Sequence, residues 1–167
     1  MRPEEVEYAR QFDAADYVDV FGLEQAGPVD ERSPEQWTRS AFDNVPAAWR
    51  TGIGWAHRQL LRFRLASSDD PDHVVGWRII ESSATVLRLE ATGSLMHGTL
   101  CVVRASPTRA QLVTALVYKR PLLARAVWAL VGPVHRRAAP LLMERAASAS
   151  APGSNDVEPV VKEPDGP

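Results

Sequence analysis

The sequence predicts an α+β domain in which an antiparallel sheet packs against a long C-terminal helix. Four β-rich segments follow one another between residues 74 and 119, and the turns between them are too short for crossover helices. From residue 121 on, apolar side chains recur at helical period. Two shorter amphipathic segments precede the sheet, so helices and strands are segregated along the chain as in α+β domains.

The opening elements are one strand and two short helices. Residues 16–21 alternate polar and apolar side chains and end at Gly22, which predicts an edge or opening strand. Residues 33–36 (Ser-Pro-Glu-Gln) resemble a capping box, so a helix should begin there and reach about Asp43. A second helix is predicted by apolar residues at spacings of three and four: Trp49, Ile53, Ala56, Leu60 and Phe63.

The predicted meander has strands at residues 74–82, 85–92, 95–105 and 109–119. A two-residue turn at Gly93-Ser94 would place Glu90 directly opposite His97. It would also place several apolar side chains together on one concave face: Leu87, Leu89, Ala91, Met96, Leu100 and Val102. A three-residue turn at 106–108 would add four more side chains to that face: Leu112, Thr114, Leu116 and Tyr118.

The closing helix should begin at Pro121 and carry one broad apolar face that includes Trp128. Gly132-Pro133 and Pro140 fall inside this pattern, and an interior proline removes a backbone hydrogen bond, which predicts a kink or a break near Gly132. The domain is expected to span residues 1–147. Residues 148–167 are rich in Pro, Ser and Ala and poor in large apolar groups, which predicts a disordered acidic tail.

Composition limits the classes of protein to consider. A chain of 167 residues with 45% hydrophobic and 24% charged content is typical of one globular domain. Its single cysteine, Cys101, excludes an intramolecular disulfide and a Cys-rich zinc site. The first ten residues lack the apolar run of a signal peptide, and the apolar stretch 122–134 is shorter than the ~20 residues of a membrane span. We therefore expect a cytoplasmic protein.

Charge is divided unevenly along the chain. Residues 1–48 hold 11 acidic and 4 basic residues, a net charge of −7, whereas residues 49–147 hold 6 acidic and 14 basic residues, a net charge of +8. This division favours an acidic N-terminal segment lying across the basic part of its own domain. The arginines are scattered, so we expect no nucleic-acid partner, while an anionic membrane surface stays open as an alternative.

Two stretches resemble a known family. They are residues 40–49 (SAFDNVPAAW) with residues 58–61 (RQLL), and residues 127–137 (VWALVGPVHRR). They are similar to a family catalogued as domain of unknown function 2867, in the START-like superfamily, also called SRPBCC. The resemblance covers about residues 16–147. It implies a helix-grip fold, in which the sheet wraps around the last helix, and an apolar small molecule held between them. Pro46, Trp49, Trp128 and His135 match motif positions whose roles in that family are unassigned.

The concave face provides the candidate ligand-binding site. We expect a mostly apolar pocket with a few polar groups, formed by Met96, Leu100, Thr114, Leu116, Tyr118, Trp128 and His135. The same side chains could instead form a solid core against the closing helix, and the sequence does not separate these two arrangements. No cofactor is expected.

Evidence for catalysis is weaker. No Gly-rich phosphate loop, GxSxG elbow or HExxH motif occurs. His135, or His97 with Glu90, could serve a cyclase, dehydratase or hydrolase in the same cavity, but each also has an ordinary structural role. Cys101 is expected to be a packed apolar residue, and His97 with Cys101 supplies only two metal ligands, so no metal is expected. The sequence thus favours a binding module over an enzyme and leaves the ligand and the oligomeric state open.

Overall fold

A computed structural model describes residues 11–24, 30–67, 70–106 and 108–149. The predicted tail, apart from its first two residues, lies outside these residues. The described chain is α+β, as predicted. Its six strands are β1 (Tyr17–Glu24), β2 (His73–Val74), β3 (Trp77–Ser82), β4 (Val86–Thr92), β5 (Met96–Ser106) and β6 (Arg109–Tyr118). Its helices are α2 (Pro34–Asp43), α3 (Ala47–Trp55), the π-helical turn η1 (Ala56–Leu60) and α4 (Pro121–Ser148).

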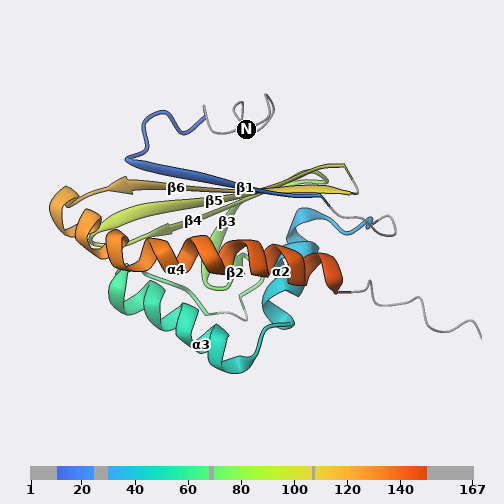
Figure 1. Ribbon diagram of the computed structural model, residues 1–167, viewed down its shortest axis with the longest axis horizontal. Coiled ribbons are helices and arrows are strands. Elements are labelled where there is room, and N and C mark those ends of the chain that lie inside the picture. Colours follow the sequence, from blue (N-terminus) through green and yellow to red (C-terminus); the bar gives the residue numbers. More distant parts are fainter. Residues whose placement is uncertain (1–10, 25–29, 68–69, 107, 150–167) are drawn as a thin grey trace, which may run out of the picture.

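The strands form one antiparallel sheet in the order β1-β6-β5-β4-β3-β2. The first strand pairs with the last, which leaves β1 at one edge, as its alternating sequence predicted. The helices pack on the same side of the sheet (Figure 1): α4 contacts β1 and β6, whereas α2 contacts β4 and β5. Because α2 and α4 lie over different strands, they leave a space between them and η1 on the helix side of the sheet.

Local sequence explains where α2 begins. The Ser33 side chain accepts a hydrogen bond from the Gln36 backbone N–H at 3.2 Å, and the Gln36 side chain accepts one from the Ser33 N–H at 3.0 Å. This is the predicted capping box, with Pro34 in the first turn, where its missing N–H costs nothing. The reciprocal bonds fix the start of α2, and Trp37 is thereby directed into the core.

The first strand predicted in the meander, residues 74–82, is wrong as a single strand. Val75 (φ 54°) and Gly76 (φ 81°) both have left-handed backbones and divide it into the β2–β3 hairpin, with Val74 opposite Trp77. Two consecutive residues at positive φ suit the right-handed twist of a tight hairpin. Valine at the first of these positions hid the turn, because β-branched residues disfavour positive φ.

The β4–β5 turn also differs from the prediction. The Gly93 N–H donates to the Met96 carbonyl, so the central turn residues are Ser94 and Leu95, and Thr92 lies opposite His97. Glu90 therefore lies opposite Thr99, not opposite His97. The register shift of two residues preserves the faces of the strands, because side chains alternate with period two.

Helix α4 is continuous through Pro133 and Pro140, so of the kink or break predicted near Gly132, the break is absent. Pro133 and Ala129 are both exposed, and the carbonyl that loses its helical hydrogen bond at that point can be hydrated. Gly132 faces the other way: a Cβ there would lie 3.3 Å from Nε1 of Trp128. Pro133 thus occupies the solvent side of a helix whose inner side packs on the sheet, whereas Pro140 is half-buried.

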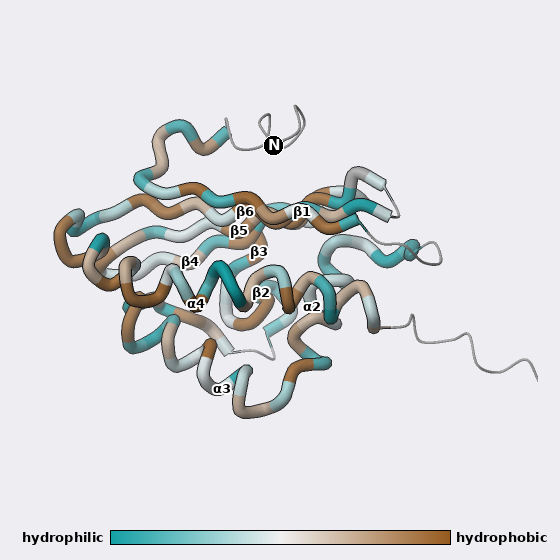
Figure 2. Tube along the Cα trace, in the orientation of Figure 1, coloured by the Kyte–Doolittle hydropathy of each residue, from teal (hydrophilic) through white to brown (hydrophobic). Residues whose placement is uncertain are grey.

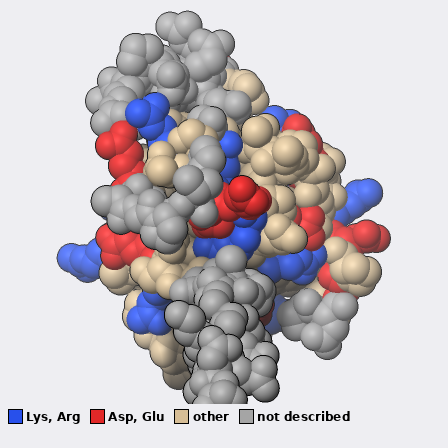
Figure 3. Space-filling view, turned by 90° about the vertical axis from the view of Figure 1, so that its right-hand side faces the viewer, with Lys and Arg blue, Asp and Glu red and all other residues tan. Residues whose placement is uncertain are grey.

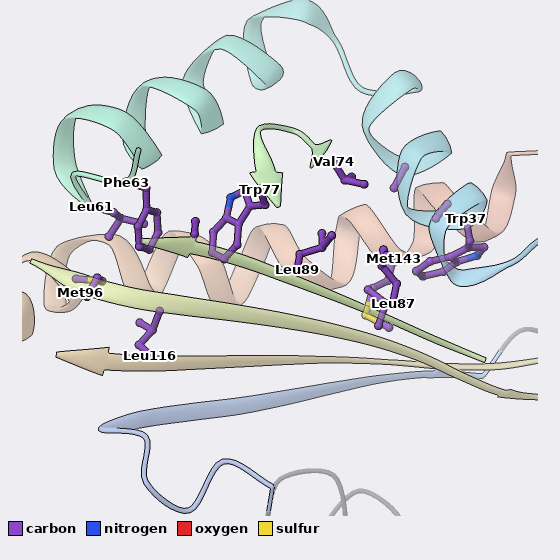
Figure 4. Close-up of a cluster of buried hydrophobic side chains, with 14 of the residues drawn as sticks. Trp37, Leu61, Phe63, Val74, Trp77, Leu87, Leu89, Met96, Leu116 and Met143 are labelled. Carbon is purple, nitrogen blue, oxygen red and sulfur yellow. The ribbon is translucent and has the colours of Figure 1, made fainter. Parts of the chain in front are cut away.

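Hydrophobic residues recur along the strands (Figure 2), and buried apolar side chains form one cluster on each face of the sheet. The larger cluster fills the space between the sheet and the helices (Figure 4), and it contains the whole predicted concave set apart from Thr114, which is buried beside it. The smaller cluster, on the opposite face, comprises Cys101, Val103 and Val113, covered by Phe12, Val18, Val20 and Val86. Cys101 is thus a packed residue, as expected, and burial raises the pKa of its thiol.

Acidic residues from the N-terminal part of the chain pair with basic residues further along it. The carboxylate of Asp30 lies 2.7 Å from Arg32 and 3.3 Å from Arg104. Arg32 also donates to the carbonyl of Ala146 in α4, and Arg104 donates to the carbonyls of Asp30 and Arg32. Figure 3 shows acidic and basic side chains interspersed at this end of the molecule.

Candidate functional site

A cavity of about 160 Å³ lies between the sheet and the helices. Every helix and the five strands other than β1 contribute to its walls, which are almost entirely apolar. Its size is close to that of engineered cavities of about 150 Å³ that stay dry and bind benzene. A small apolar molecule, or the apolar part of a larger one, fits this volume.

The cavity reaches the surface between α3 and α4. Val134 is 64% exposed and also borders the cavity, and Ile53 of α3 and Ala138 of α4 line it while only half-buried. α3 makes little contact with α4, so side chains rather than a packed helix interface close this opening. A ligand could therefore enter between these two helices.

An aromatic group forms one wall. The ring centroids of Phe63 and Trp77 are 5.0 Å apart in an edge-to-face arrangement, and His57 packs edge-on against both rings. Figure 4 shows Phe63 and Trp77 directed into the space above the sheet. Gly98 beneath them is required for space, because a Cβ there would lie 2.9 Å from each ring.

His57 is neutral in this wall. Burial, with the charges of His135 and Arg58 adding to it, lowers its pKa to about 4. Its Nδ1 accepts a hydrogen bond from Trp77 Nε1 at 3.3 Å, so the imidazole proton is on Nε2. His57 therefore contributes an uncharged imidazole to the cavity lining.

A group of polar side chains lies at one end of the cavity, between β1, β6 and α4, whereas Thr38 and His57 line the cavity from α2 and η1. We call this end the polar corner and define it as Tyr17, Asp19, Thr114, Trp128 and His135. Asp19 and Thr114 are paired across β1 and β6, and α4 carries His135 over both. His135 Nε2 lies 3.2 Å from Thr114 Oγ1 and 3.3 Å from Asp19 Oδ2.

The remaining contacts make the polar corner a connected network. The Tyr17 hydroxyl donates to Asp19 Oδ2 at 2.6 Å, and burial together with this bond raises the pKa of Tyr17. The Trp128 ring packs against Tyr17 and His135, with centroids 4.9 and 5.4 Å away. Because Asp19 can only accept, the imidazole nitrogen facing it carries a proton. The carboxylate thereby orients His135 at the cavity wall.

Five of the seven residues predicted for the site line the cavity: Leu100, Thr114, Leu116, Trp128 and His135. Met96 and Tyr118 lie opposite each other on β5 and β6 and pack in the same core, but they are not part of the cavity wall. The sequence analysis missed Asp19 and His57. Strict alternation along β1, which puts Tyr17, Asp19 and Phe21 on one face, is the signal that could have placed Asp19 there.

His97 and Glu90 cannot act in this cavity, which corrects that alternative. His97 Nε2 lies 3.7 Å from Glu90 Oε2, but both side chains are on the opposite face of the sheet. His97 is held instead by Thr92, with its Nδ1 2.8 Å from the Thr92 hydroxyl. The pair is half-exposed and on the face of the sheet away from the helices.

Within the described residues, no three His, Cys, Asp or Glu side chains gather as a metal site. In the same part of the chain, no helix has the length and apolar character needed to cross a membrane. Comparison with known proteins gave no further assignment: no protein-family model matches the chain, and neither does any curated protein or solved structure.

Proposed function

We propose that this chain is a binding module for an apolar or amphipathic small molecule, held between the sheet and α4. The observation that carries the proposal is an apolar cavity that reaches the surface between two helices and has few polar groups in its wall, several of them gathered at one end. Ligand pockets commonly have this composition, with many apolar walls and a few placed polar groups. We propose further that the sheet grips α4 as in the START-like superfamily that the sequence resembles.

A second candidate function is acid–base catalysis in the same cavity. Its support is the Asp19–His135 contact of 3.3 Å, since a carboxylate that orients an imidazole is a common part of a general base. Among the residues that the structure describes, the nucleophile next to His135 is the Thr114 hydroxyl, 3.2 Å away and largely buried. Binding without turnover is therefore the better supported function.

The cavity can be tested by filling it. Leu116 lines it and is 1% exposed, whereas Val117, the next residue on β6, points to the other face. In the wild type, n-butylbenzene at about ten times its Kd should add ~1.4 kcal/mol, which is a rise of several degrees in Tm. Leu116→Trp should abolish that rise with little loss of stability, and Val117→Trp should keep it.

The opposite outcome is a solid core. There, Leu116→Trp overpacks the interior and costs about 1–3 kcal/mol, and the wild type shows no rise in Tm with n-butylbenzene. Those two results together would contradict the proposal. The residues of the cavity wall would then simply form a packed core.

A further inference from the structure

Two groups in the polar corner lack hydrogen-bond partners. Oδ1 of Asp19, an acceptor, and Nε1 of Trp128, a donor, are both buried and unpaired within the described residues. An unpaired buried polar atom costs free energy, so such atoms often mark the place of a missing partner. Trp128 is 7% exposed and lines the cavity.

The two unpaired groups belong to the same end of the cavity. Trp128 packs against Tyr17 and His135, and both of those side chains contact the other oxygen of Asp19, at 2.6 and 3.3 Å. The polar corner reaches the cavity through Thr114, Trp128 and His135, which line it, and Asp19 adjoins these side chains without lining the cavity itself. A group that passes between them meets one unused donor and one unused acceptor.

The free acceptor and the free donor of the polar corner distinguish three kinds of ligand head group. A carboxylate has acceptors only and would face the charge of Asp19. An ammonium has donors only and would leave Trp128 Nε1 unpaired. A hydroxyl is both donor and acceptor, and it satisfies both groups without adding a charge. Resting on the function proposed above, we infer that the ligand is an uncharged apolar molecule with a terminal hydroxyl, which donates to Asp19 and accepts from Trp128.

Arg136 is a nearby cation that could favour a carboxylate over a hydroxyl. Its guanidinium lies 3.5 Å from the Tyr17 hydroxyl, but the side chain is exposed and does not line the cavity. Asp19 does not line the cavity either, but its side chain is 13% exposed, whereas the exposed Arg136 is screened by water. The carboxylate is therefore the less screened of the two charges.

Four probes with one skeleton test the inference: n-propylbenzene, 3-phenylpropan-1-ol, 3-phenylpropanoate and 3-phenylpropylammonium. Their Kd values are measured by calorimetry at pH 7.5 on the full chain. The alcohol should bind about tenfold more tightly than the carboxylate, which faces the charge of Asp19. It should exceed the ammonium by a similar factor, because the ammonium loses the hydration of a full charge in an apolar cavity and leaves Trp128 Nε1 unpaired. The alcohol should also bind more tightly than the hydrocarbon.

Variants of Trp128 and Asp19 test whether these two groups cause the preference for the alcohol. Trp128→Phe should weaken the alcohol about tenfold relative to n-propylbenzene, since it removes the donor, and n-propylbenzene itself reports the effect of the smaller ring. Asp19→Asn should strengthen 3-phenylpropanoate about tenfold, since it removes the repelling charge. Trp37→Phe is the control, because Trp37 lines the cavity from α2 and lies outside the polar corner. It should not change the preference for the alcohol.

The results distinguish this inference from the function on which it rests. If n-propylbenzene binds but the carboxylate or ammonium equals the alcohol, the hydroxyl assignment is wrong and the cavity proposal stands. If the alcohol preference survives Trp128→Phe unchanged, the assignment is also wrong. If none of the four probes binds, both proposals fail.

Discussion

Among the described residues, His57 has the pKa that is shifted furthest from its usual value. Its pKa of about 4 in the folded protein lies below the 6.5 of an exposed histidine, chiefly because it is buried. The unfolded chain then binds one more proton than the folded chain between these two values, and folding stability is lost as the pH falls through this window.

We predict that the free energy of unfolding falls by about 2 kcal/mol between pH 7 and pH 4.5 because of His57 alone. The carboxyls of Asp30, Glu35 and Asp70 have lowered pKa values and affect stability mainly below this range. Urea unfolding of His57→Gln, which cannot titrate, should lose most of this slope. His97→Gln, on the other face of the sheet, should retain it, and an equal slope in all three proteins would contradict the assignment.

The Asp30 carboxylate is the most enclosed anion among the described ion pairs. Its side chain is 7% exposed and that of Arg104 is 5% exposed, whereas the Glu35–Arg39 pair on α2 is 27% and 33% exposed. Removing one member of a buried pair leaves the other charge uncompensated.

Asp30→Asn should therefore lower the free energy of unfolding by about 3 kcal/mol, measured by chemical denaturation. The matched change Glu35→Gln should cost less than about 1 kcal/mol, because exposed pairs contribute little. Equal effects of the two changes would mean that Asp30 does not hold Arg32 and Arg104 together as described.

At the scale of elements, Pro133 is the clearest local conflict with secondary structure. It lies inside α4 and supplies no N–H for the carbonyl of Ala129. Pro121, in the first turn of the same helix, carries no such penalty because that N–H would have no helical partner.

Pro133→Ala should raise the free energy of unfolding by about 1 kcal/mol or more, by restoring a backbone hydrogen bond at an exposed position. Pro121→Ala should leave it unchanged or lower. Both are measured by urea denaturation, and destabilisation by Pro133→Ala would show that the proline fixes the path of α4.

The sequence predicted the elements and their faces better than it predicted their ends. The concave face was assigned correctly although the β4–β5 turn was placed wrongly, because a shift of two residues keeps the same side chains on the same face. The β2–β3 hairpin was missed because Val75 is unusual at positive φ. Of the kink or break predicted in α4, the break was wrong because hydration and packing outweigh the local penalty of Pro133.

At the scale of the whole molecule, the cavity depends on contacts between distant segments. The hydrophobic pattern within any one segment does not predict such contacts. Periodicity identified the sheet and α4 walls, which hold Leu116 and Trp128. The opposite wall comes from α2, η1 and the segment around Phe63, whose position over Gly98 follows from tertiary packing. For the same reason, Asp19 and His135, far apart in the chain, could not be recognised as neighbours from sequence.

The central claim is that an apolar ligand occupies the cavity between the sheet and α4. The chain has five tryptophans, each with one indole N–H signal in a ¹H–¹⁵N NMR spectrum. Trp37, Trp77 and Trp128 line the cavity, whereas Trp49 and Trp55 are 40% and 57% exposed.

Titration with n-butylbenzene, followed on these five signals, is the most direct measurement of that claim. We predict saturable shifts of the three cavity indoles, and signals of Trp49 and Trp55 that stay in place. Shifts confined to the two exposed indoles, or no saturable shift at all, would contradict a ligand-binding cavity.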